Sequence, residues 1–309
     1  MDYFVLTDHD TMSGYESLLR ELPAVDQRLV IPAVEHALFE PTLGFSIHIN
    51  LFQLDPDTYA DLRRRVETLT DLADFCAQRH IYMQYNHPTW WERDEIKAGV
   101  VDVTRVPEAA RHFTVLELNA GRTPALNRVT ENLARSLGKH LTAGSDTHTG
   151  EVGRAYTEAP GQTAASFLAG IWQGKATPSI CNMSYRGMLA MIHGMIDDVF
   201  DHRRAVRVRK SAMDSGNPNV ERLTRSILGS NRVMRNGWVR EPLRCMLKQV
   251  ARPIVWNLLA HERQLERELR ASDLHELFES TIKLQDPRLE SSRPESVARA
   301  IRTVETPAS

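Results

Sequence analysis

Histidine and acidic side chains recur in the first half of the chain where short apolar runs end. The first apolar run, Tyr3 to Leu6, is followed at once by Asp8, His9 and Asp10. The later members of this pattern are Glu35 and His36, His48, His87 in Asn86-His87-Pro88, Glu117, and Asp146 and His148 in Gly144-Ser145-Asp146-Thr147-His148. A single residue of this kind is more often structural than a ligand, but the repeated placement favours one shared site.

Imidazole together with carboxylate is a donor set that suits zinc, manganese or iron. A carboxylate can bridge two cations, which neutral histidines cannot do, so the pattern predicts a centre with more than one divalent metal ion. Two metal ions a few Å apart can bind ester oxygens and an ionised water, which is an arrangement that hydrolyses phosphate esters.

The elements that position these residues follow from the alternation of β-rich runs with helical periodicity, which predicts an α/β domain with a mainly parallel sheet over residues 1–180. Strands are expected at Tyr3–Thr7, Leu29–Glu35, Phe45–Leu51, Ile81–Tyr85, Thr114–Leu118 and His140–Ala143. Helices are expected at Tyr15–Glu21, Asp57–Gln78, Pro107–Arg111, Pro124–Leu137 and Ala164–Gln173. Carboxyl ends of parallel strands gather on one face, so the site residues should converge there.

The strand pattern stops near Met188. Helices are expected at Arg222–Leu228, Pro242–Val250, Ile254–Leu269 and Leu274–Leu284, with breaks at Gly216-Asn217-Pro218, Asn236-Gly237 and Pro253. This divides the chain into an α/β domain at 1–180, a helical C-terminal domain at 188–286 and a flexible tail at 287–309.

Composition supports a globular protein. The chain has 309 residues, of which 42% are hydrophobic, and a formal net charge of −2. The apolar runs are too short for a membrane span, no secretion signal opens the chain, and we expect a cytoplasmic protein. Three scattered cysteines, Cys76, Cys181 and Cys245, argue by their spacing against a disulfide framework and a cysteine zinc site, and we expect reduced, buried thiols.

Charge is unevenly distributed. Residues 1–200 carry 17 basic and 26 acidic side chains, whereas residues 201–253 carry 13 basic and 4 acidic ones. The basic segment 203–252 could contact nucleic acid or a membrane surface. We favour a simpler interpretation, in which its basic face packs on the acidic α/β domain or faces water.

The motifs resemble those of the PHP (polymerase and histidinol phosphatase) superfamily of metal-dependent phosphoesterases, over about residues 1–180. The elements that carry the resemblance are Thr7-Asp8-His9-Asp10-Thr11, Ile31-Pro32-Ala33-Val34-Glu35, Asn86-His87-Pro88 and Gly144-Ser145-Asp146-Thr147-His148. The resemblance implies a distorted (β/α)7 TIM-like barrel with up to three metal ions at its strand ends. It also implies hydrolysis of a phosphomonoester or phosphodiester by a metal-activated hydroxide.

Site residues follow from the resemblance, motif by motif. Glu35, His48 and His87 would surround one ion, and His48 is matched by order more than by motif. Glu35 would also bridge to a second ion shared with Asp146. His9 and His148 would hold the third ion. The general acid is open, with Asp8, Asp10 and His148 as the candidate catalytic groups.

The family's first motif, an H-x-H on the first strand, has no counterpart before Thr7. The barrel is therefore expected to lack its first strand, and the chain as given should have weak or absent activity and reduced stability. Either the native chain starts further upstream, which we favour, or the domain is degenerate. The degenerate case leads to an alternative function, an inactive PHP-like module for ligand binding or protein interaction.

Substrate recognition is less specified. Arg122 follows Glu117-Leu118-Asn119-Ala120-Gly121, and its planar guanidinium suits a phosphate, although an ordinary salt bridge is the commoner role. Trp90 and Trp91 could stack on a base or pack in a core. His36 should point away from Glu35 and is left out of the ligand set. The expected partner is a small phosphorylated substrate, and a nucleotide is one of the candidates.

Overall fold

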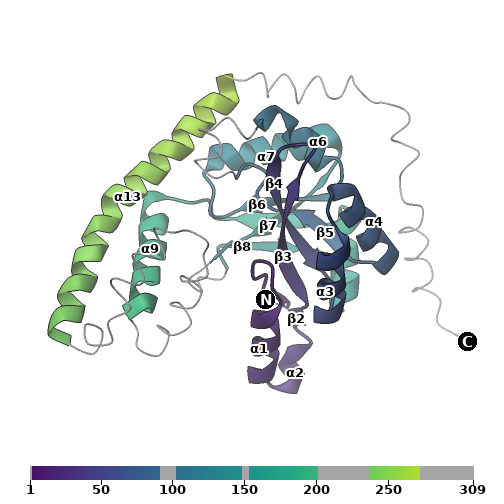
Figure 1. The fold of residues 1–309 in the computed structure, drawn as a ribbon, viewed down its shortest axis with the longest axis horizontal. Helices are drawn as coiled ribbons and strands as arrows, with labels where there is room; N and C mark the ends of the chain where they lie inside the picture. Colours follow the sequence, from purple (N-terminus) through teal and green to yellow (C-terminus); the bar gives the residue numbers. More distant parts are fainter. Residues whose placement is uncertain (1, 91–101, 148–152, 201–236, 272–309) are drawn as a thin grey trace, which may run out of the picture.

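The computed structural model describes residues 2–90, 102–147, 153–200 and 237–271 (Figure 1). Its centre is a five-stranded mixed sheet in the order β3-β4-β5-β6-β7. The strands are β3 (Ala33–Glu40), β4 (Phe45–Phe52), β5 (Tyr82–Tyr85), β6 (Val115–Asn119) and β7 (His140–Gly144). The first two pairings are antiparallel and the last two are parallel, so the expectation of a mainly parallel sheet is wrong for β3 and β4.

Two small sheets accompany the central one. β1 (Phe4–Val5) pairs in parallel with β2 (Val30–Ile31), and β8 (Ala155–Glu158) pairs antiparallel with β9 (Thr177–Ile180). The sequence did not predict β8 or β9. No closed barrel forms among the described residues. Of the expected (β/α)7 barrel, the structure therefore confirms only the α/β class.

The β3–β4 hairpin explains the antiparallel part of the sheet. The strand expected to end at Glu35 continues to Glu40, and the chain turns back through Gly44, which has a φ of 80°. The amides of Leu43 and Gly44 both donate to the Glu40 carbonyl and close the turn. A positive φ suits glycine because it has no Cβ. Glu35 therefore lies inside a strand rather than at its end.

The helices before residue 173 are α1 (Ser13–Glu21), α2 (Ala24–Gln27), α3 (Pro56–Arg65), α4 (Leu69–Arg79), α6 (Val106–Ala110), α7 (Pro124–Leu137) and α8 (Ala164–Trp172), with a 3-10 turn at Val103–Arg105. α7 has the predicted bounds, with Thr123 as its cap and Pro124 at its first turn. The single helix expected at Asp57–Gln78 is two helices. Asp55 caps α3, and Thr68 with Asp71 forms a capping box that starts α4 afresh.

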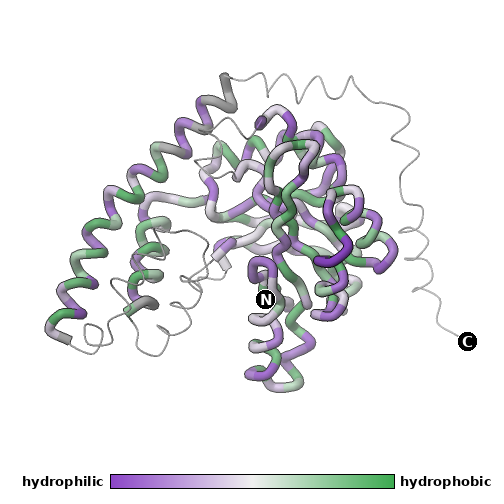
Figure 2. Tube along the Cα trace, in the orientation of Figure 1, coloured by the Kyte–Doolittle hydropathy of each residue, from purple (hydrophilic) through white to green (hydrophobic). Residues whose placement is uncertain are grey.

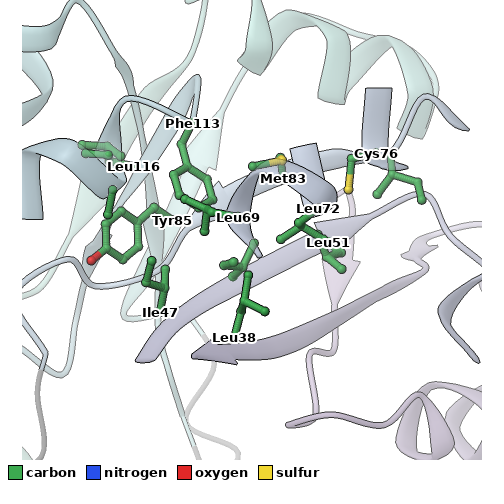
Figure 3. Packing of buried hydrophobic residues seen from close by; sticks show 14 of the residues in the cluster. Leu38, Ile47, Leu51, Leu69, Leu72, Cys76, Met83, Tyr85, Phe113 and Leu116 are labelled. Atoms are coloured by element: carbon green, nitrogen blue, oxygen red, sulfur yellow. The ribbon is translucent and has the colours of Figure 1, made fainter. Parts of the chain in front are cut away.

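The main core lies between the central strands and α3, α4, α6 and α7 (Figure 3). Its fully buried side chains include Ile47 and Leu51 from β4 and Leu72 from α4. Cys76 is also buried in this core, but Cys181 and Cys245 are exposed, so the expected burial is wrong for these two. A second cluster packs α8 onto Ile31 and Val115. Apolar residues concentrate along the central strands, whereas apolar and polar residues alternate along the C-terminal helix (Figure 2). Apolar packing thus holds the strands that carry Glu35 and His48.

Two helices follow the sheet, α9 (Tyr185–Phe200) and α13 (Gly237–Ala271). α13 runs along α9 (Figure 1) and continues through Pro253, where the sequence predicted a break. Ala251 and Val255 are buried on either side of Pro253, and Val255 packs against Met183 and Met188. The predicted helices at Arg222–Leu228 and Leu274–Leu284 and the tail at 287–309 lie outside the described residues. Among the helices that are described, none is long and apolar enough to cross a membrane.

A buried asparagine fixes the loop between β6 and α7. The Asn119 amide donates to the Asn127 side-chain oxygen at 3.0 Å. The Asn127 Nδ2 donates to the Asn119 carbonyl at 2.9 Å and to Asn182 Oδ1 at 2.6 Å. These hydrogen bonds of Asn127 position the loop that carries Arg122.

We predict that Asn127→Ala lowers the free energy of unfolding by about 2 kcal/mol, because it leaves buried partners without hydrogen bonds. Asn132→Ala on the same helix is the control, since the Asn132 side chain makes an exposed contact with Arg135. Its effect should stay within about 0.5 kcal/mol. Equal losses in the two variants, measured by urea unfolding, would contradict this role for Asn127.

Candidate metal centre

Three segments bring histidines to Glu35. An isolated parallel bridge pairs His9 with Glu35: the Asp10 amide donates to the Glu35 carbonyl, and the Glu35 amide donates to the Asp8 carbonyl. His48 lies on β4, beside β3, and His87 follows the end of β5. The antiparallel hairpin therefore delivers His48 from the middle of a strand, and the convergence predicted from the sequence is observed for these four residues.

The Glu35 carboxylate is the common neighbour of the three imidazoles. Its Oε1 lies 3.1 Å from His48 Nδ1 and 3.4 Å from His87 Nε2, and its Oε2 lies 3.8 Å from His9 Nε2. The His48 ring centre is 5.3 Å from that of His9 and 5.2 Å from that of His87. Glu35 and His87 are buried, whereas the His9 side chain is half exposed. The cluster is therefore open to solvent on the His9 side.

These donors fit a metal cation. One ligand atom from each of His9, Glu35 and His48 lies within 4.8 Å of the other two. Glu35 Oε1 and His48 Nδ1 are both buried, and neither atom has a hydrogen-bond partner. Buried polar atoms in native proteins normally have a partner, and a missing cation is a common reason when they do not. A divalent ion between these atoms would satisfy both.

Electrostatics keep Glu35 ionised and His87 neutral, the forms that bind a metal, whereas in the metal-free cluster they favour a proton on His48. Burial raises the pKa of Glu35, but the nearby His48 and His87 imidazoles outweigh it and hold that pKa far below its usual range. Burial lowers the pKa of His48, while Glu35 raises it by more, so the net pKa is above its ordinary value. For His87 burial dominates and the pKa is lowered, which keeps that ring neutral near pH 7.

A second acidic group lies on the neighbouring strands. Asn119 Nδ2 donates to Glu117 Oε2 at 3.2 Å and to Asp146 Oδ2 at 3.1 Å, which joins the two carboxylates. Burial and the charges of Asp146 and Glu35 raise the pKa of Glu117 to about 8. Gly144 makes room for Glu117, because a Cβ there would lie 1.8 Å from Glu117 Oε1. Glu117 stood in the recurring pattern but not among the predicted ligands, and its burial is what marks it.

Asp8 and Asp10 differ in their surroundings. The Asp8 carboxylate lies against Gly14, where a Cβ would be 1.8 Å from Oδ2, at the start of α1. Asp10 Oδ1 lies 3.2 Å from His36 Nδ1, and it accepts from the Ala37 amide at 3.1 Å and from the Tyr59 hydroxyl at 3.3 Å. The structure ties Asp10 and His36 to each other rather than to Glu35. His36 thus points away from the cluster, as expected.

Arg122 is fully buried, and its guanidinium carbon lies 3.8 Å above the Trp90 ring. It also forms an ion pair with Glu262 of α13. Glu262 gave no signal in the sequence, because 140 positions separate it from its partner. Asp146 lies next to this loop, whereas His148 and Trp91 lie outside the described residues.

Three site residues have positive φ angles that side chains other than glycine rarely adopt: Asp10 at 52°, His87 at 29° and Asp146 at 47°. Such conformations cost free energy and persist where the surroundings impose them, which is most often at functional sites. Their presence at one site agrees with a functional role that outweighs the cost of these conformations in folding free energy.

Comparison with known proteins gives one family-model match. Residues 124–176 match the model described as PHP-associated. This match supports the resemblance to the PHP superfamily that the motifs predicted. The curated proteins contain no match to the chain.

Two solved structures are similar in part. One is a two-domain protein from Bacteroides vulgatus ATCC 8482 containing a predicted PHP-like metal-dependent phosphoesterase, with a TM-score of 0.41, 15% identity and coverage of 58% of this chain and 56% of that one. The other is a metal-dependent phosphoesterase, so described provisionally, from Bifidobacterium adolescentis ATCC 15703, with a TM-score of 0.31, 13% identity and coverage of 55% and 85%. This chain thus spans about half of the first structure. At these TM-scores the likenesses carry no argument about function.

We predict that Glu35→Gln and His48→Ala each weaken Zn²⁺ or Mn²⁺ binding by more than about tenfold, since losing even an outer partner of a metal ligand commonly costs that much. Isothermal titration calorimetry measures the affinity. His80→Asn is the control, because His80 is exposed and has the left-handed conformation that asparagine tolerates. Unchanged binding in Glu35→Gln would exclude Glu35 as a ligand.

We also predict that Glu117→Gln reduces the pH dependence of stability in the metal-free protein. The folded pKa of about 8 exceeds the ordinary value of 4.5, so the stability that protonated Glu117 contributes is present below pH 4.5 and is lost as the pH rises through 8. Glutamine stays neutral and removes this loss. The melting temperatures of both proteins between pH 5 and pH 8 test this, and parallel curves would contradict it.

Proposed function

We propose that this chain is a divalent-metal-dependent phosphoesterase of the PHP type that hydrolyses a small phosphorylated substrate. The observation that carries the proposal is the set of His9, Glu35 and His48 ligand atoms within 4.8 Å of one another, with buried Glu35 and His48 atoms that lack hydrogen bonds. The PHP-associated match at residues 124–176 supports the same family.

Under this proposal, His9, Glu35, His48, His87, Asp146 and His148 hold two or three ions of zinc, manganese or iron. When bound, divalent cations would supply Lewis acidity toward the phosphoryl oxygens and would lower the pKa of water. Glu35 is suited to bridging because its two oxygens face different histidines, Oε1 toward His48 and His87 and Oε2 toward His9.

The other side chains of the site act on charge and protons. Arg122 would receive the phosphoryl oxygens, since a guanidinium binds a tetrahedral oxyanion through two parallel N–H groups. Asp8 and His148 remain candidates for the proton donor to the leaving group. Asp10, bonded to His36, Ala37 and Tyr59, is better placed to hold the His9 segment against β3 than to transfer a proton.

We predict that the purified chain shows at least weak hydrolysis of 4-nitrophenyl phosphate or bis(4-nitrophenyl) phosphate when Mn²⁺ or Zn²⁺ is supplied. Glu35→Gln and His87→Ala should each reduce kcat/KM by at least about a hundredfold, the loss that follows removal of one group that stabilises a transition state. His80→Asn, with its exposed side chain, should keep the wild-type rate.

Metal binding without turnover of either ester or of a nucleotide panel would contradict the proposed activity. The retained metal site would then favour the inactive binding or interaction module. Turnover that persists in Glu35→Gln would show that the activity does not use this cluster.

A further inference from the structure

A row of ring contacts leads from the histidine cluster to Arg122. The His87 ring centre is 5.2 Å from that of His48 and 6.2 Å from that of Trp90, and the Arg122 guanidinium lies 3.8 Å above Trp90. Burial lowers the pKa of Arg122, and the charges of Glu262, Asp146 and Glu117 offset part of that change. Arg122 is thus electrostatically connected to the acidic part of the site.

The partner of Arg122 comes from the C-terminal helix. Glu262 is 7% exposed, on a helix whose other described charged side chains are not buried. One Glu262 oxygen meets Arg122 Nη1, while Arg122 Nε and Glu262 Oε2 are buried without hydrogen bonds. Burying two charges costs more than such an imperfect pair returns. The contact therefore has a poor geometry for a purely structural ion pair.

An open pocket lies beside this contact. It has a volume of about 420 Å³ between the start of α7 and α13, and Arg128, Met183, Leu259 and Arg263 are among its lining residues. Nearer the start of α13, Arg244 and Lys248 form ion pairs with Asp197 of α9. Displacing Glu262 from Arg122 would therefore break few close contacts with the sheet domain, and the contacts with α9 could remain.

We propose that the Glu262 carboxylate stands in for the substrate's phosphoryl group at Arg122, so that α13 is a self-inhibiting cover that phosphate must displace. The inference rests on the proposed function, because that function places a phosphoryl oxyanion at Arg122. A carboxylate offers two oxygens and one negative charge, whereas a phosphoryl group offers three oxygens and more charge. The phosphoryl group can also reach the Nε that Glu262 leaves without a partner.

The first test is the affinity of the full chain for inorganic phosphate in the presence of Mn²⁺, measured by isothermal titration calorimetry. If Glu262 covers Arg122 about nine-tenths of the time, Glu262→Gln should bind phosphate about tenfold more tightly. Glu241→Gln is the matched control, because Glu241 is a carboxylate of the same helix that pairs with Arg240 and Arg244 near the surface. Its affinity should equal that of the wild type.

An ion pair with only a structural role predicts the opposite. In that case Glu262→Gln would bind phosphate as the wild type does, or less tightly, and the proposal would be overturned. It would also fail if neither protein bound phosphate. Combining Arg122→Ala with Glu262→Gln should abolish the gain.

Hydrogen–deuterium exchange of the wild-type chain tests the same idea without a variant. Adding phosphate should increase amide exchange in α13 around Glu262 at least severalfold and leave exchange around Lys248 unchanged. Unchanged exchange around Glu262 at saturating phosphate would overturn the proposal. Because both readouts are binding measurements, the predicted pattern without ester hydrolysis would refute the phosphoesterase activity alone. Hydrolysis with equal phosphate affinities would refute the cover alone.

Discussion

A buried carboxylate that requires positive charge is the constraint on which the rest of the structure depends. Glu35 lies on the rigid β3–β4 hairpin and faces three imidazoles, of which at least His87 is neutral near pH 7. Burial of an ionised carboxylate is costly unless cations or hydrogen bonds compensate it. The core between the sheet and its covering helices holds β3 and β4 in place, so this charge cannot escape to solvent.

Sequence patterns located the strands well where β-branched and aromatic residues form short runs. The runs around Ile47 and Leu116 are strands as predicted, and the cap at Thr123 set the start of α7. The sequence patterns did not reveal that β3 and β4 pair antiparallel, because that direction is set by the tight turn at Gly44. One helix was expected at Asp57–Gln78, but the structure has two, because Thr68 caps a new helix. The apolar pattern runs on through this cap and therefore did not reveal the break.

The residue types that meet at the candidate site were predictable from the sequence, whereas its tertiary contacts were not. His9, Glu35, His48 and His87 follow a pattern of residue type and position that survives in the fold. Asp10 belongs to the same motif as His9, yet its left-handed backbone directs its carboxylate to His36. The pairing of Glu262 with Arg122 depends on how α13 packs after a long intervening segment, and no local pattern encodes that.

The most direct measurement is anomalous diffraction from a crystal of the chain grown with Zn²⁺ or Mn²⁺, recorded at the absorption edge of the metal. A metal peak bonded to Glu35 together with His48 is the result that a metal centre at this cluster predicts. Metal peaks elsewhere in the molecule, with no peak at Glu35 and His48 at saturating metal, would contradict it.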